Sequence, residues 1–237
     1  MYEPARRRFD SALRLKTGPA TQSKMKFNFL TMAEVLAVAA GMVVFALFSH
    51  QGWPWILVGV AGLLVAAIAI EQSLRRTPRV GALLGLDGFS QRTALLSVVG
   101  CELGAGAGLL HRWQLDLPLL PAGGLEVFAA IACLIGATEE LVYRGWLQGR
   151  LRTLGWPVAV VVAAAAHAAY KSALFAWSPG SAEIDCAVVA RWTFGGGVIF
   201  GLLRQVSGSV APSMVAHAAF DLLVYGALAR APWWVWN

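Results

Sequence analysis

Ionisable side chains interrupt the apolar segments in the second half of this 237-residue chain. A charge at the centre of a membrane helix costs roughly 2.5–3.5 kcal/mol on insertion scales, so such residues mark candidate functional sites. A carboxylate and a histidine on facing helices can hold and deprotonate a water molecule, and a second histidine can donate to a developing oxyanion. The candidates for this chemistry are Glu139, Glu140, Arg144, His167, Lys171, Arg191, His217 and Asp221.

Three pairs of these residues stand four positions apart and therefore share one face of a helix. They are Glu140 with Arg144, His167 with Lys171, and His217 with Asp221. We expect the first pair to form a structural ion pair, and Lys171 and Arg191 to lie at the membrane interface. Glu139 lies about 100° around its helix from Glu140, so the two acids are expected to have different roles.

Helix geometry predicts that three of these groups lie at a similar depth in the membrane. At a rise of about 1.5 Å per residue, Glu139 and His167 lie roughly 15–16 Å above the expected inner ends of their helices, and His217 about 12 Å. We therefore predict that one acid and two imidazoles from separate helices share one cavity.

Two other chemistries have to be weighed for this region: a zinc-bound water and a nucleophilic serine. Two histidines with carboxylates could ligate zinc that carries a bound water, although the chain has no His-Glu-x-x-His sequence. Ser172 and Ser213 lie near the candidates, but neither is plainly paired with a base. The residues therefore favour a carboxylate-activated water without a cofactor and leave zinc open.

The composition indicates which elements must position these residues. Hydrophobic residues make up 58% of the chain and charged residues 14%, with a mean hydropathy of +0.63, whereas soluble domains are about 45–50% apolar and about 25% charged. These values exclude an ordinary soluble domain and a disordered chain. The apolar runs predict an all-α polytopic membrane protein with about seven transmembrane helices, at 29–48, 53–70, 93–110, 125–150, 156–176, 187–204 and 209–229. The last four would form a catalytic four-helix core.

The net charge of +6 is unevenly distributed between the predicted loops. Basic residues gather in the segments 1–28 and 71–92, whereas the loops expected on the other side contain only Arg112 and Arg230. This asymmetry predicts a cytoplasmic N-terminus that faces the anionic lipids of the bilayer. Nucleic-acid binding is not expected, because aromatic residues are not interleaved with the basic ones.

The pattern divides the chain into four parts. We expect a basic cytoplasmic tail at 1–28, amino-terminal membrane helices at 29–123, a catalytic membrane domain at 124–229 and an aromatic tail at 230–237. Glycines in the third predicted helix would let a neighbouring helix approach closely.

Three motifs, in order on consecutive predicted helices, resemble those of one family. Residues 139–144 match Glu-Glu-x-x-x-Arg. Residues 163–167 stand where that family has Phe-x-x-x-His, with Ala163 in place of the aromatic residue, and residues 217–221 resemble its His-x-x-x-Asn/Asp motif. Over about residues 124–229 the chain is similar to the CPBP family, which comprises the type II CAAX prenyl endopeptidases and their bacterial relatives and is also called the Abi family.

The resemblance implies an intramembrane endopeptidase of the glutamate type that hydrolyses a peptide bond in a membrane-anchored or lipid-modified protein. It implies four catalytic residues and two supporting ones: Glu139, His167, His217 and Asp221, with Glu140 and Arg144. The first two would activate the water, and His217 and Asp221 would stabilise the oxyanion. Because Asp221 replaces the commoner asparagine, it would have to be protonated or pair with His217.

The bacterial relatives include bacteriocin self-immunity proteins and enzymes that process C-terminal sorting signals, so the resemblance also implies the bacterial inner (cell) membrane. Two other functions stay open at this point. One is a non-catalytic membrane partner of the immunity type, and the other is a proton-coupled transporter that uses the buried acids and histidines as a relay. The substrate and the oligomeric state are also left open.

Overall fold

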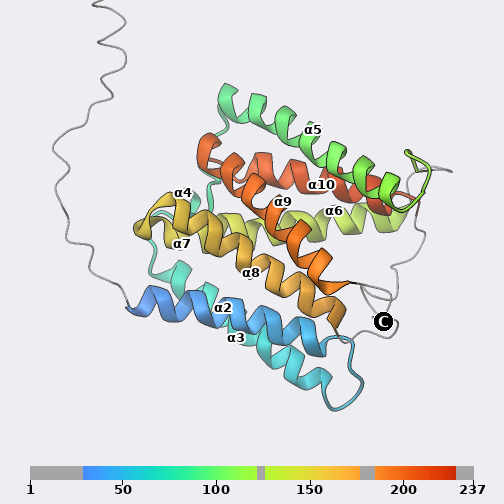
Figure 1. Cartoon of the computed structure of the whole chain (residues 1–237). Coiled ribbons are helices and arrows are strands. Elements are labelled where there is room, and N and C mark those ends of the chain that lie inside the picture. Colours follow the sequence, from blue (N-terminus) through green and yellow to red (C-terminus); the bar gives the residue numbers. More distant parts are fainter. Residues whose placement is uncertain (1–28, 122–125, 177–184, 228–237) are drawn as a thin grey trace, which may run out of the picture.

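A computed structural model describes residues 29–121, 126–176 and 185–227, which are helical for most of their length and contain no strand (Figure 1). In chain order the elements are α2 (Phe29–Phe48), α3 (Ile56–Arg75), α4 (Val80–Leu84), α5 (Gln91–Gln114), α6 (Val127–Glu140), η1 (Leu141–Leu147), α7 (Gln148–Leu151), η2 (Arg152–Leu154), α8 (Trp156–Ala176), α9 (Cys186–Ser207) and α10 (Ala211–Tyr225). The all-α prediction is confirmed for these residues. The predicted tails at 1–28 and 230–237 lie outside them.

Five helices in the described part of the chain are long and apolar enough to cross a membrane: α2, α3, α5, α8 and α9. The chain is thus an integral membrane protein. The prediction of seven spans is not confirmed, because α6 has 14 residues before η1 begins and α10 has 15. At about 1.5 Å per residue, α10 is some 22–23 Å long, which is shorter than a hydrocarbon core of about 30 Å, whereas α6 continues with a changed winding through η1 into α7.

The helices near the N-terminus flank the later ones on two sides (Figure 1). Helices α2 and α3 pair with each other, and α2 packs against α8. Helix α5 lies on the opposite side and packs along α10. Helices α6, α8, α9 and α10 lie between these two flanks, so the elements that bear the candidate residues form the interior of the bundle.

Glycines allow α5 to lie directly against the backbone of α10. Gly100, Gly104 and Gly108 are buried on one face of α5, and a Cβ atom added at Gly104 would overlap the backbone carbonyl of Ala216. The neighbouring Gly106 faces open space. The expected close approach is therefore present, and it places α5 behind the residue that precedes His217.

A buried acid links α2 to the elements at one end of the bundle. Glu34 is 5% exposed and pairs with Arg76, just after α3, and with Arg150 of α7. Arg150 also donates to the Thr31 hydroxyl at 3.2 Å. Because one carboxylate meets two guanidinium groups, the flank formed by α2 and α3 is joined to the segment that follows Arg144.

The predicted helix at 125–150 changes its winding after Glu140. The α-helix ends there, and residues 141–147 form the π-helix η1, whose wider turns are rare and often occur at functional sites. Tyr143, Trp146 and Leu147 of η1 are at most 1% exposed. The change in winding therefore lies in the core and starts next to the two acids.

We predict that Gly104→Ala destabilises the protein, whereas Gly106→Ala does not. The new methyl group at position 104 must displace α10, and overpacking of this kind costs about 1–3 kcal/mol, while position 106 has room for it. Thermal unfolding of both variants in the same detergent measures the difference. Equal melting temperatures for the two variants would contradict the close contact between α5 and α10.

Candidate active site

Four candidate side chains meet in the interior of the bundle. Glu139 and Glu140 are the last two residues of α6. His167 lies near the middle of α8, and His217 lies near the middle of α10. Their exposed fractions are 5%, 0%, 3% and 7% in that order. Groups that are far apart in the sequence are therefore brought together in a place that is nearly closed to solvent.

Two residues of α8 hold the Glu139 carboxylate. His167 Nε2 lies 3.1 Å from Glu139 Oε2, and Lys171 Nζ lies 2.7 Å from Glu139 Oε1. His217 Nε2 of α10 lies 3.8 Å from Glu139 Oε2. One acid of α6 thus faces both imidazoles, and each of its oxygens has its own partner on α8.

Arg144 sets the tautomer of His167. Its Nη1 lies 2.7 Å from His167 Nδ1, and because a guanidinium can only donate, Nδ1 must accept. The imidazole is therefore neutral and carries its proton on Nε2, from which it donates to Glu139. Gly197 of α9 leaves room for this arginine, since a Cβ atom there would lie 2.7 Å from Arg144 Nη2.

Glu140 has different hydrogen-bond partners from Glu139. Its Oε1 accepts from Arg144 Nη1 at 3.0 Å, which is the expected i,i+4 ion pair. The same oxygen accepts from His217 Nδ1 at 2.9 Å. Glu140 therefore joins η1 to α10 and fixes the ring of His217 so that Nε2 points toward Glu139.

Asp221 lies beside the same nitrogen of His217. Its Oδ2 is 3.8 Å from His217 Nε2, which is within ion-pair range but too long for a direct hydrogen bond. The carboxylate also lies against Gly136 of α6, where a Cβ atom would collide with it. The site thus has two acids, Glu139 and Asp221, that each lie 3.8 Å from one imidazole nitrogen.

Aromatic rings hold the two imidazoles in place. The Tyr143 ring of η1 stacks on His167, with centroids 4.5 Å apart and an interplanar angle of 20°. The Phe200 ring of α9 lies 5.8 Å from the ring of His217. These packed rings limit rotation of the histidines, which a precise hydrogen-bond geometry requires.

An apolar pocket of about 270 Å³ reaches Glu139 from the side of the bundle. Its walls come from α2, α6, η1 and α8, and its lining residues are Met42, Ile131, Leu134, Ile135, Thr138, Glu139, Val142 and Tyr170. Ile131 and Leu134 are also exposed on the outer surface, at 43% and 69%. The pocket therefore connects the lipid-facing surface with the carboxylate.

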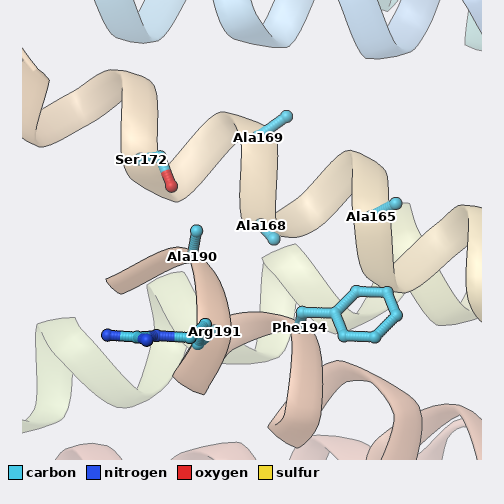
Figure 2. Close-up of a pocket in the computed structure, with 7 residues that line it drawn as sticks. All are labelled: Ala165, Ala168, Ala169, Ser172, Ala190, Arg191 and Phe194. Carbon is cyan, nitrogen blue, oxygen red and sulfur yellow. The ribbon is translucent and has the colours of Figure 1, made fainter. Parts of the chain in front are cut away.

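A second hollow, of about 410 Å³, lies between α8 and α9 but does not reach these acids (Figure 2). It is lined by Ala165, Ala168, Ala169, Ser172, Ala190, Arg191 and Phe194. Its α8 residues lie on a different face from His167 and Lys171. We therefore assign the site to the smaller pocket, where charged groups and an opening coincide.

Comparison with known families gives one match. The family model described as type II CAAX prenyl endopeptidase Rce1-like matches residues 121–223. This segment of the chain is therefore similar in sequence to that family. No curated protein and no solved structure gives a match.

The CAAX endopeptidase-like domain includes every candidate residue named above, from Glu139 to Asp221. Helices α2, α3 and α5 precede the matched segment, yet Met42 of α2 lines the pocket that reaches Glu139. In the described residues, no group of three or more His, Cys, Asp or Glu side chains has a geometry that holds a metal ion. Glu139 Oε2 and Glu140 Oε1 instead accept hydrogen bonds within the site, whereas Glu139 Oε1 and Glu140 Oε2 have no hydrogen-bond partner in the described residues.

The sequence misplaced one contributor to the candidate site and missed another. Lys171, expected at the membrane interface, is only 25% exposed and contacts Glu139. Its spacing of four residues from His167 is the sequence signal for its position, because it places both side chains on the same face of one helix. Tyr143 gave no signal, because its contact with His167 depends on the π-helical winding of η1.

We predict that Arg144→Met strongly destabilises the protein, because it leaves the fully buried Glu140 carboxylate without its cation. Breaking one partner of a buried pair costs about 3–5 kcal/mol. The double variant Glu140→Gln/Arg144→Met should lose less stability, since no buried charge is left uncompensated. Thermal unfolding in detergent measures both.

The exposed pair of Glu71 and Arg75 is the matched control for this prediction. It has the same i,i+4 spacing, but its side chains are 46% and 74% exposed. Arg75→Met should therefore cost only about 0.5 kcal/mol or less. If Arg144→Met lowered the stability as little as the control variant does, the buried pair would not be formed.

Proposed function

We propose that this protein is an intramembrane endopeptidase that hydrolyses a peptide bond of a membrane-associated or lipid-modified protein. The observation that carries the proposal is the buried Glu139 carboxylate, which is held on both oxygens and borders a pocket open to the lipid-facing surface. The family match over residues 121–223 supports the same class of reaction.

Glu139 is the general base of the proposed reaction. A water molecule donates a hydrogen bond to the carboxylate, and its oxygen attacks the carbonyl carbon of the scissile bond while one proton passes to Glu139. His167 already donates its Nε2 proton to Glu139 Oε2. It therefore orients the base and does not itself receive the proton, which differs from the shared role implied by the family resemblance.

His217 stabilises the negative charge that develops on the carbonyl oxygen. Its Nδ1 donates to Glu140, so Nε2 becomes a donor when the ring is an imidazolium. Asp221 and Glu140 both lie close enough to favour that cation. Asp221 therefore pairs with His217 in this mechanism, which removes the repulsion between an ionised aspartate and an oxyanion.

Collapse of the tetrahedral intermediate completes the reaction. The carbon–nitrogen bond breaks, and Glu139 returns the proton taken from water to the leaving nitrogen. The products are a carboxylic acid and an amine, and Glu139 is again ionised. No further reactant is required.

The lining of the pocket supports a substrate that reaches the site from the membrane. Seven of its eight lining residues are uncharged, and all but one of these are apolar or aromatic. A peptide segment embedded in the bilayer can enter such a pocket without exposing its own apolar side chains to water. The partners we propose are therefore a membrane-anchored protein or peptide and the surrounding lipid.

We predict that Glu139→Gln abolishes cleavage of membrane peptides in proteoliposomes while the protein stays folded. The amide cannot accept the proton of water, and loss of a general base costs about 10²–10⁴-fold in rate. Cleavage should persist in the presence of a chelator, because in this mechanism protein side chains alone activate the water and stabilise the oxyanion. Glu102→Gln on α5, whose acid is exposed, is the control and should retain full activity.

The outcomes of that experiment separate the alternatives. Sensitivity of the wild-type protein to chelator would favour a zinc-bound water. Proton flux without cleavage would favour a transporter, and unchanged behaviour of the folded Glu139→Gln variant would favour a non-catalytic binding protein. Cleavage of water-soluble peptides as fast as membrane peptides would contradict access through the lateral pocket.

We propose that the N-terminus faces the cytoplasm of a bacterial inner membrane. Basic residues gather at the end of the bundle where α3 ends, α5 begins and α7 lies (Figure 1): Arg75, Arg76, Arg79, Arg92, Arg150 and Arg152. A tag at the N-terminus should be digested by protease in inverted inner-membrane vesicles and protected in intact spheroplasts. The reverse pattern of protection would overturn this orientation.

A further inference from the structure

Lys171 is placed where a cation can act on the proposed base. Its Nζ lies 2.7 Å from Glu139 Oε1, and its side chain is 25% exposed, whereas Glu139 is 5% exposed. The ammonium also lies 5.8 Å from the centroid of the Tyr170 ring, which lines the pocket. Lys171 therefore reaches from the rim of the site to the buried carboxylate.

The two residues of α8 contact different oxygens of the Glu139 carboxylate. His167 makes a hydrogen bond to Oε2, and Lys171 makes an ion pair with Oε1. Oε1 has no hydrogen-bond partner in the described residues, so its lone pairs stay available to water. Two contacts from one helix face fix both the position and the rotation of the carboxylate plane, which a single contact would not.

The other cations near the site do not contact Glu139 Oε1. Arg144 Nη1 is engaged by Glu140 Oε1 and His167 Nδ1, and Arg191 lies at the separate hollow between α8 and α9 (Figure 2). His217, when it is an imidazolium, faces Oε2 at 3.8 Å. Within the described residues, Lys171 is therefore the cation that contacts Glu139 Oε1.

We infer that Lys171 is a positioning residue of the active site, which holds Glu139 in the orientation needed to activate water and compensates its buried charge. This inference rests on the proposed function. The carboxylate must keep its free lone pair of Oε2 directed toward His217 Nε2, 3.8 Å away, because water and the carbonyl oxygen have to meet there. Without Lys171, the Glu139 carboxylate loses its closest contact, on Oε1, and can rotate about the hydrogen bond to His167.

The test compares Lys171→Met and Lys171→Arg with the wild type in the proteoliposome assay. Methionine keeps the length of the side chain without its charge, and we expect kcat to fall by about 10²-fold with KM changed by less than about threefold, as misplacement of a reacting group predicts. Arginine retains the charge and should restore kcat to within about tenfold of the wild type. Arg191→Met, which removes a cation at the other hollow, should have wild-type kinetics.

Three kinetic results would overturn the inference. The first is a wild-type kcat for Lys171→Met, since the base would then be positioned without the lysine. The second is an equal loss of kcat for Lys171→Arg and Lys171→Met, and the third is a rise in KM at constant kcat. Either of these would mean that Lys171 does not act through the orientation of Glu139.

A double-mutant cycle on thermal stability tests the contact without relying on activity. Lys171→Met should lower Tm by about 4 °C in the wild-type background and by clearly less in the Glu139→Gln background, because only the former leaves a buried carboxylate uncompensated. Equal shifts in the two backgrounds would overturn the pairing itself. If the wild type cleaves no peptide but the cycle shows coupling, the contact stands and the proposed function fails, together with the positioning role.

Discussion

The constraint on which the structure depends is the presence of two adjacent carboxylates, Glu139 and Glu140, in an apolar bundle. A buried carboxylate is stable only if cations and hydrogen-bond donors replace the water that it has lost. Each acid obtains its partners from other elements: Glu139 from α8, and Glu140 from η1 and α10. Compensation of the two charges therefore ties together three segments that are distant in the sequence. The interactions that make burial tolerable are the same ones that fix the geometry of the site.

Local winding and close packing determine how these partners reach the acids. The α-helix gives way to η1 directly after Glu140, so Arg144 and Tyr143 project from wider turns and meet His167 from two sides, one through a hydrogen bond and one through ring stacking. On the opposite flank, glycines bring α5 against the backbone of α10 beside His217. The position of each imidazole is thus set by packing around its helix as well as by its own hydrogen bonds.

The helices outside the matched segment also contribute to the pocket and to the packing around the site. Residues 121–223 contain the charged cluster, but α2 supplies one wall of the pocket that reaches Glu139, and Glu34 joins α2 to Arg150 near the end of α7. In the proposed reaction, this arrangement gives a bilayer-embedded peptide a route to the base, while the cluster itself stays nearly closed to solvent. A separately folded four-helix core would lack part of that wall.

The sequence by itself determined the helical class, the bounds of α2 and α8, and the ion pair between Glu140 and Arg144, because hydropathy and i,i+4 spacing are local properties of the chain. It also singled out Glu139, His167 and His217 by their cost in a membrane. Only the tertiary structure decided that Lys171 contacts Glu139, that His167 donates rather than accepts at Nε2, and that the charged cluster has a lateral pocket. These features depend on which faces of separate helices meet and on the π-helical turns after Glu140, and neither is encoded in the periodicity of a single segment.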